Sequence, residues 1–264
     1  MTEIYSLHAA ESPVLISVPH AGQKIPRDIG QRLTDAGRAL PDTDWYVDRL
    51  YGFATGLGAS LLVAHYSRYV IDLNRPPDDQ ALYATRTTGL VPLETFAGAP
   101  LYRPGLKPDA EDISDRTIRY WQPWHRELET RLQATVQRYG FAVLLEAHSI
   151  LSEVPALFEG VLPHLNLGSY DGRSAAPDLV GAVFNGLASH SDYDVVLDGR
   201  FKGGFTTRHY GRPADGIHAL QLEMAQRVYM QEMPPAPNAE RAGKAQKLLR
   251  DLVNILLHWK PGHE

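Results

Sequence analysis

The sequence predicts a single α/β domain over residues 1–264, with helices on both faces of a mostly parallel or mixed central sheet. Three observations predict this three-layer α/β/α class. Short apolar runs alternate with longer segments of helical periodicity. The length of 264 residues suits one large α/β domain. No internal repeat, low-complexity tract or change of composition marks a domain boundary.

Strands are predicted where short apolar runs pass into polar or glycine residues. Runs that are apolar on both faces are typical of parallel strands covered by helices. In chain order, the predicted strands are Val14–Val18, Ser60–His65, Tyr69–Leu73, Phe141–Ala147, Tyr193–Leu197 and Ile217–Met224.

Helices are predicted where apolar residues recur every three or four positions. One covers Asp42–Gly58, with Gly58 as its stop, and a long one with Ile113 on its apolar face ends near Gly140. His125 lies on the apolar face of the long helix, so we expect it in the core. Two more helices cover Pro177–Ala188 and the segment that follows an Asn238 cap.

Two segments lack a clear period. The stretch between Arg75 and Asp109 is rich in Pro, Gly, Thr and Asp, which is typical of a long binding loop or lid. The segment Arg200–Tyr210 concentrates cations, glycines and hydroxyls, and we expect it to be a loop that meets an anion or a solvated turn.

Composition excludes several classes of function. With 26 Lys and Arg against 31 Asp and Glu, the net charge of −5 does not favour a nucleic-acid partner. The sequence has no secretory leader pattern and no apolar run long enough for a membrane span, so we expect a cytoplasmic protein without a membrane partner. The absence of cysteine excludes disulfides, thiol nucleophiles and thiolate metal sites. Nothing in the sequence indicates the oligomeric state.

Polar residues occur at or near the carboxyl ends of four predicted strands. Ligands of α/β proteins gather at these ends, so we expect the four ends to form one crevice. The residues are His20, the run Asp72-Leu73-Asn74-Arg75, the pair Glu146 and His148, and the pair Gln221 and Glu223.

His20 and His148 are the best candidates for metal ligands, because imidazoles and carboxylates are what remains for a divalent ion without cysteine. Either histidine could instead be a hydrogen-bonded structural residue. A third ligand would be a carboxylate from Asp44 or Asp48, which lie four positions apart on one predicted helix face. Asp44 could equally interact with the helix dipole, Asp48 could be a solvated partner of a cation, and Asp42 competes as the N-cap.

Glu223 shares one strand face with Gln221 and is either an ion-paired rim residue or a functional carboxylate. Three arginines, Arg68, Arg75 and Arg208, lie in polar segments where their guanidinium groups could bind carboxylates in a bidentate manner. Arginines are also common solubilising residues on surfaces.

Seven segments together resemble the N-formylglutamate amidohydrolase family. In chain order they are SVPHAG at 17–22, DTDWYVDRLY at 42–51, SRYVIDLNRP at 67–76, EAHSI at 146–150, GRFKGG at 199–204, TRHYG at 207–211 and LQLE at 220–223. The resemblance implies a zinc-exopeptidase-like (phosphorylase/hydrolase-like) fold and a Zn²⁺ cofactor, with manganese, cobalt or iron as alternatives.

The resemblance also assigns roles to residues. Asn74 and Arg75 match a carboxylate-binding motif of related aminoacylases, and Glu223 matches the general base. The usual His-x-x-Glu metal motif is broken here by Gln23, so the resemblance leaves the carboxylate ligand to Asp44, with Asp48 as second choice. Arg68 would stabilise the oxyanion and Arg208 would bind a second substrate carboxylate.

The expected activity is metal-dependent hydrolysis of the dicarboxylate N-formyl-L-glutamate to formate and L-glutamate, as in histidine degradation. One alternative is a zinc amidohydrolase that acts on another N-acyl amino acid. Another is a non-catalytic α/β protein that binds anions. The absence of a G-x-S-x-G elbow excludes the usual serine hydrolase.

Overall fold

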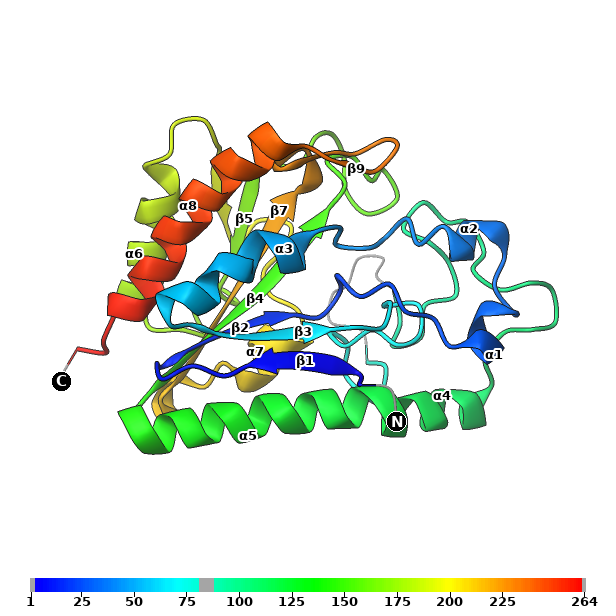
Figure 1. Cartoon of the computed structure of the whole chain (residues 1–264), viewed down its shortest axis with the longest axis horizontal. Helices are drawn as coiled ribbons and strands as arrows, with labels where there is room; N and C mark the ends of the chain where they lie inside the picture. The colour runs from blue at the N-terminus through cyan, green and yellow to red at the C-terminus, as the bar shows by residue number, and fades with distance from the viewer. Residues whose placement is uncertain (1–2, 81–87, 263–264) are drawn as a thin grey trace.

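Seven strands form one mixed sheet in this computed structural model, which describes residues 3–80 and 88–262 (Figure 1). The strand order across the sheet is β1-β3-β2-β4-β7-β5-β6. The strands are β1 (Tyr5–His8), β2 (Val14–Val18), β3 (Ser60–Ala64), β4 (Ala142–Ile150), β5 (Leu165–Gly168), β6 (Val195–Leu197) and β7 (Ile217–Ala225). A small hairpin of β8 (Met230–Gln231) and β9 (Ala236–Pro237) forms a separate two-stranded sheet.

The centre of the large sheet is parallel and fully covered. Strands β3, β2, β4 and β7 run parallel to one another, and every residue of β2, β4 and β7 is buried. Antiparallel pairs occur on both sides, where β1 joins β3 and β5 joins β7. The sheet is therefore mixed, and the carboxyl ends of β2, β4 and β7 lie together.

Helices cover both faces of the sheet, as Figure 1 shows. One apolar cluster joins the sheet to α3 (Val47–Tyr51), α6 (Pro177–Ala188) and α8 (Ala239–His258). A second cluster joins the other face to α5 (Gln122–Tyr139) and α7 (Phe205–Tyr210). This confirms the predicted α/β class and its three layers.

Shorter elements complete the chain. A π-helical turn, η2 (Thr117–Trp121), continues α4 (Ala110–Arg116) into α5, so the three form one long rod along the sheet. Helices α1 (Arg27–Gly30) and α2 (Asp35–Arg38) lie at one end of the molecule. The 3-10 turns are η1 (Gly52–Leu57), η3 (Pro213–Asp215) and η4 (Gln226–Val228).

The predicted strand Tyr69–Leu73 is wrong, because this segment forms turns and irregular backbone. Its apolar side chains are buried as those of a strand would be. However, the Asp72 carboxylate accepts a hydrogen bond from the backbone N–H of Asn74 at 2.9 Å and closes a turn that a strand could not contain. The carbonyl of Val70 is satisfied by the side chain of Arg116 at 3.1 Å rather than by a neighbouring strand.

The predicted helix Asp42–Gly58 is shorter than expected. It begins only at Val47, after Tyr46 in the left-handed region, and continues as the 3-10 turn η1 to the predicted stop at Gly58. Residues 42–46 are irregular because their polar groups are used elsewhere. The Asp42 carboxylate accepts from the N–H of Phe96, and the Asp44 carboxylate contacts β4.

Several short elements have weak sequence signals and were not predicted, among them α1, α2, the β8–β9 hairpin, β1, β5 and α7. Strands β1 and β5 are four residues each, and β1 alternates between half-buried and exposed positions. Helix α7 occupies most of the second half of the segment Arg200–Tyr210, which we expected to be a loop. The described residues of the predicted loop between Arg75 and Asp109 contain no helix or strand, while residues 81–87 lie outside the described part of the chain.

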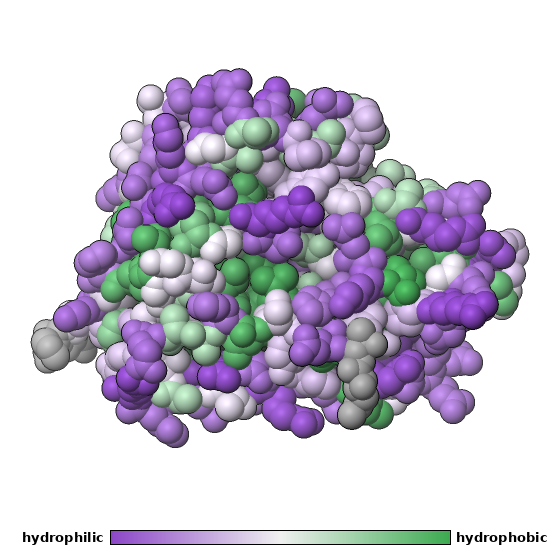
Figure 2. Space-filling model, in the orientation of Figure 1, coloured by the Kyte–Doolittle hydropathy of each residue, from purple (hydrophilic) through white to green (hydrophobic). Residues whose placement is uncertain are grey.

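The large apolar residues that remain exposed are scattered along the chain rather than clustered. Figure 2 shows hydrophilic residues over much of one face, with smaller apolar areas between them. Among the helices at 3–80 and 88–262, none has the length and apolar character needed to span a bilayer.

His125 is buried in the core beneath the sheet, as predicted. The carbonyl of Leu73 accepts from Nε2 at 2.9 Å, which places the ring proton of the neutral imidazole on Nε2. The hydroxyl of Tyr210 is 3.0 Å from Nδ1 and also donates to the backbone carbonyl of His125 at 3.1 Å, so these two acceptors share its proton. Burial lowers the pKa of His125 from 6.5 to about 3.

We therefore expect His125 to make the fold sensitive to acid. The unfolded imidazole binds a proton below its pKa of 6.5 and the folded one does not, so stability falls as the pH drops from 6.5 towards 3. At pH 5 this single group costs about 2 kcal/mol relative to pH 7.5. Urea unfolding at the two pH values should show a smaller decline for His125→Gln than for the unchanged protein. His8→Gln, which alters an exposed histidine on β1, should leave the decline as it is, and an equal decline in all three proteins would contradict the assignment.

Candidate metal and active site

The register of the central strands assembles a polar row on one sheet face. Ser17 on β2 is paired with Glu146 on β4, which is paired with Gln221 on β7. Two positions further on, His148 is paired with Glu223. Because alternate strand residues share a face, all five side chains lie on the face that α7 covers. The predicted crevice at the strand ends is thus present.

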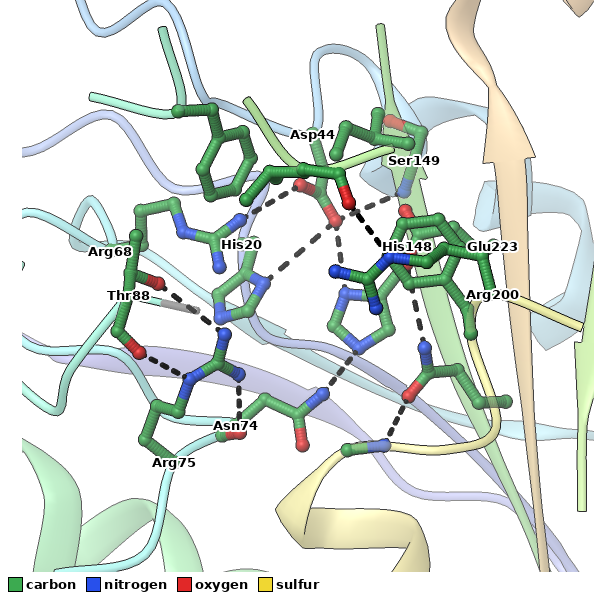
Figure 3. Close-up of a pocket in the computed structure, with 16 residues that line it drawn as sticks. His20, Asp44, Arg68, Asn74, Arg75, Thr88, His148, Ser149, Arg200 and Glu223 are labelled. Carbon is green, nitrogen blue, oxygen red and sulfur yellow. Dashed lines mark hydrogen bonds and ion pairs between the residues drawn. The ribbon is translucent and has the colours of Figure 1, made fainter. Parts of the chain in front are cut away.

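His20, Asp44 and His148 form a buried cluster at this crevice. Their ligand atoms all lie within 4.8 Å of one another, and each side chain is at most 3% exposed. The carboxylate oxygen Oδ2 of Asp44 is 3.1 Å from Nδ1 of His148 and 3.9 Å from Nδ1 of His20. Figure 3 shows the three side chains converging from separate segments of the chain. Two imidazoles and one carboxylate are a donor set that could hold a divalent metal ion.

The environment of His20 fits this role. Its Nε2 lies 2.8 Å from Oδ1 of Asp72, whereas its buried Nδ1 has no hydrogen-bond partner among residues 3–80 and 88–262. An orphaned buried nitrogen is costly unless something else occupies it. Burial, aided by the charge of Arg68, lowers the pKa of His20 to about 4, so the ring is neutral and able to bind a metal at pH 7.

His148 is held differently. Burial lowers its pKa, but the hydrogen bond with Asp44 and the nearby carboxylates outweigh burial and raise the pKa to about 9. Burial opposes ionisation of Asp44, yet its contacts with His148, His20 and Arg68 lower its pKa. A metal ion at Nδ1 of His148 would therefore compete with a proton that bridges to Asp44.

Local backbone structure explains why Asp44 joins the histidines and Asp48 does not. Asp44 lies in the irregular segment before α3, where its N–H donates to the carbonyl of His20 at 3.1 Å and its carboxylate accepts from the N–H of Ser149. Asp48 lies within α3 and is half-buried. Gln23, at the position of the usual glutamate ligand, is exposed and points to a different surface.

The Asp72 carboxylate contacts three other groups of the site. In addition to His20, its carboxylate accepts from Nη2 of Arg68 at 2.7 Å and from the N–H of Asn74. Burial opposes ionisation, but the charges of His20 and Arg68 hold the pKa of Asp72 well below its usual range. One buried carboxylate thus fixes a candidate metal ligand, a cation and the turn that carries the next two polar residues.

Glu223 lies on the opposite side of the cluster and is also buried. Its Oε2 accepts from Nε2 of Gln221 at 3.4 Å, and the Gln221 oxygen in turn accepts from the N–H of Gly204. Burial raises the pKa of Glu223 above its ordinary value. A carboxylate with a raised pKa in a pocket is suited to accept and return a proton near neutral pH.

Three arginines line the same pocket, and Figure 3 shows their guanidinium groups around its open space. Arg68 has its second terminal nitrogen, Nη1, 3.7 Å from the Asp44 carboxylate. Arg75 is held by the carbonyl of Thr88 at 2.8 Å. Arg200 donates from Nε to the carbonyl of Leu157 at 3.0 Å, and its guanidinium group lies toward the pocket.

Arg208 is placed differently from our expectation, since it does not line this pocket. It belongs to helix α7, where its Nε donates to the carbonyl of Gly203 at 2.8 Å and its guanidinium packs over the ring of Tyr170. Arg200, from the same basic segment, lines the pocket in its place.

Asn74 lines the pocket, as expected, but its side chain also has structural contacts. Its Oδ1 accepts from the N–H of Thr206 at 2.9 Å, and its Nδ2 lies 3.0 Å from Nε2 of His148. Gly204 packs against it so closely that an added Cβ would lie 2.3 Å from Nδ2. Only glycine fits there.

The sequence places Asp72 and Glu146 among the polar residues of the crevice but assigns no role to either of them. Arg200 is part of the predicted basic segment, and nothing in the sequence ranks it above its neighbours. Glu146 follows an apolar run on the same strand face as His148, which was the available signal.

The fold and this site define a hydrolase of the α/β class, with a buried group of residues that could hold a metal ion. Residues 12–230 match the N-formylglutamate amidohydrolase family, and the chain belongs to this family. The chain is 47% identical over 260 residues to N-formylglutamate deformylase of Pseudomonas aeruginosa, covering 98% of both proteins. It is 46% identical over 260 residues to N-formylglutamate deformylase of Pseudomonas putida, covering 98% of this chain and 97% of that protein.

A solved structure is also similar. The crystal structure of N-formylglutamate amidohydrolase from Ralstonia eutropha JMP134 matches with a TM-score of 0.82 at 27% identity, covering 96% of each chain. The family resemblance predicted from the sequence motifs is thereby confirmed.

We expect Asp72→Asn to weaken Zn²⁺ binding by about 10–100-fold, because the amide no longer provides a charged partner for His20 and Arg68. The affinity can be measured by competition with a chromophoric chelator. Asp112→Asn is the matched control, since Asp112 also pairs with two arginines, Arg32 and Arg116, but lies outside the pocket lining. Equal losses in both variants would show that Asp72 has no specific effect on the metal site.

Proposed function

We propose that this protein hydrolyses N-formyl-L-glutamate to formate and L-glutamate with a divalent metal ion, Zn²⁺ being the first choice. The observation that carries the proposal is the buried group of His20, Asp44 and His148 with Glu223 beside it in one pocket. The family and the names of the two Pseudomonas relatives support the substrate. We place the reaction in histidine degradation and in the cytoplasm, as the sequence resemblance implies.

The residues present fit a metal ion. The donors are nitrogen and oxygen atoms, they are buried together, and Nδ1 of His20 has no other partner among the described residues. When bound, such an ion lowers the pKa of a water molecule and stabilises negative charge on a carbonyl oxygen.

Glu223 would act as general base and then general acid. Its carboxylate takes a proton from the attacking water as the new C–O bond forms at the formyl carbon. It then delivers that proton to the amide nitrogen as the C–N bond breaks, so that the amine leaves as a neutral group. Its raised pKa and its place in the pocket favour both steps.

Arg68 would stabilise the negative charge that develops on the formyl oxygen. Its Nη2 is held by Asp72, which keeps the guanidinium fixed while Nη1 points to the side of the pocket that contains Asp44. A preorganised donor of this kind contributes about 3 kcal/mol to the transition state.

The two substrate carboxylates would bind to Arg75 and Arg200. Both line the pocket, and both are oriented by backbone carbonyls, of Thr88 and Leu157. Asn74 would assist Arg75 through its second amide hydrogen. The protein carries a net charge of −5, so attraction of a dianion must be local, and the three arginines of this pocket provide it.

The proposal is tested by measuring formate release from N-formyl-L-glutamate, with N-acetyl-L-glutamate as the comparison substrate. We expect turnover to disappear on removal of metal by a chelator and to return with Zn²⁺. Glu223→Gln should retain the metal but lose a factor of about 10²–10⁴ in kcat, because it cannot transfer the proton. Glu153→Gln, an exposed carboxylate, serves as the control. Full turnover in metal-free protein would refute the mechanism.

Arg200→Lys and Arg208→Lys form a second test within one basic segment. We expect Arg200→Lys to raise KM for N-formyl-L-glutamate about tenfold or more, because lysine loses the bidentate geometry. Arg208→Lys should leave KM nearly unchanged, because Arg208 packs on Tyr170 outside the pocket. Both KM values can be measured by steady-state kinetics. A larger rise in KM for Arg208→Lys than for Arg200→Lys would contradict the assignment of Arg200 to substrate binding.

A further inference from the structure

We infer that Glu146 is a positioning residue for His148, whose Nε2–H it accepts when Nδ1 of that ring binds a metal ion. The inference rests on the proposed metal site and deepens it. It gives a role to a buried carboxyl group that the proposed reaction does not use.

Glu146 lies directly behind His148 on the same face of β4. Its side chain is 0% exposed, and its Oε1 is 3.7 Å from Nε2 of His148. Neither carboxyl oxygen makes a hydrogen bond of normal geometry among residues 3–80 and 88–262, although the hydroxyl groups of Ser17 and Thr206 are close enough to lower its pKa. A buried acceptor with only these weak hydroxyl contacts therefore faces the outer nitrogen of a candidate metal ligand.

Asn74 is the nearest other group to Nε2 of His148, and it cannot be the acceptor. A backbone N–H, that of Thr206, donates to one atom of the Asn74 amide at 2.9 Å, so that atom must be the oxygen. The amide nitrogen then faces Nε2 at 3.0 Å. A neutral imidazole with a metal ion on Nδ1 carries its proton on Nε2, and an NH₂ group cannot accept it.

His20, the other candidate histidine ligand, has the carboxylate partner that His148 needs. Nε2 of His20 is 2.8 Å from the Asp72 carboxylate, the usual arrangement in which a carboxylate orients a metal-binding histidine. With Glu146 as acceptor, each of the two imidazoles has one carboxylate behind it. When the metal binds, the 3.7 Å contact would shorten to a hydrogen bond, and the Asn74 amide nitrogen, 3.0 Å from Nε2, would move away from the new proton.

The free-energy cost of burying Glu146 also supports a role for this residue in metal binding. A carboxyl group buried without a hydrogen bond destabilises a fold, and an apolar residue of similar size is often neutral or stabilising in its place. Glu146 lies among Ser17 on β2, Gln221 on β7 and the helix α7, a layer that could be filled by apolar side chains. Glu146 therefore destabilises the metal-free fold, and the hydrogen bond that it makes with His148 in the metal-bound state offsets this loss of stability.

The test compares Glu146→Leu and Glu146→Gln for Zn²⁺ affinity and for urea unfolding of the metal-free protein. We expect Glu146→Leu to bind Zn²⁺ about 10–100-fold more weakly while its metal-free stability is unchanged or higher. Glu146→Gln, whose amide oxygen can still accept, should have intermediate affinity. Thr207→Val is the matched control, because it removes another unpartnered polar group from the same buried layer without facing His148.

A structural role alone would lower stability and affinity together, and that result would overturn the inference. Unchanged Zn²⁺ affinity in Glu146→Leu would overturn it as well, and would leave the proposed deformylation intact if formate release persists. As a second readout, NMR of ¹⁵N-labelled histidine in the Zn²⁺-loaded protein should show a hydrogen-bonded Nε2 proton that Glu146→Leu lacks. Absence of Zn²⁺ binding in the unchanged protein would instead refute the metal site itself.

Discussion

The Asp72 carboxylate is the constraint on which the site depends. It is fully buried, it accepts from His20, Arg68 and the backbone of Asn74, and it remains ionised because these hydrogen bonds and the positive charge of Arg68 outweigh its burial. Removal of one partner would leave a buried charge that is only partly compensated, which is strongly destabilising. His20, Arg68 and the loop with Asn74 and Arg75 are therefore positioned by one group.

The sheet register supplies the rest of the geometry. Since β2, β4 and β7 are adjacent and parallel, their carboxyl ends meet, and the pairing of His148 with Glu223 sets the distance between a candidate metal ligand and the proposed base. Segments outside the sheet then add what the strands lack: Asp44 comes from the irregular chain before α3, and Arg200 from the basic segment before α7. A protein of net charge −5 thus presents three arginines in one pocket.

Much of this arrangement could be predicted from the sequence, because buried strands and long helices have strong periodic signals. His20 and His148 are ligand candidates in the sequence because each follows a predicted buried strand, although β4 continues through His148 to Ile150. The predicted strand Tyr69–Leu73 was wrong because its apolar pattern reflects burial, whereas its backbone is satisfied by side chains. The choice between Asp44 and Asp48, and the placement of Arg208 on α7, depend on where a short helix begins, and short helices are set by tertiary contacts.

The contact between Gly204 and Asn74 has a consequence for any attempt to redesign the pocket. Because the backbone at position 204 lies against the Asn74 amide, a larger residue there displaces either that amide or the helix that follows it. The backbone before α7 and the loop that carries Asn74 therefore cannot move independently of each other. Substrate range is more easily altered from the side of Arg200 and Leu157, where the wall is built from side chains that can change without moving the backbone.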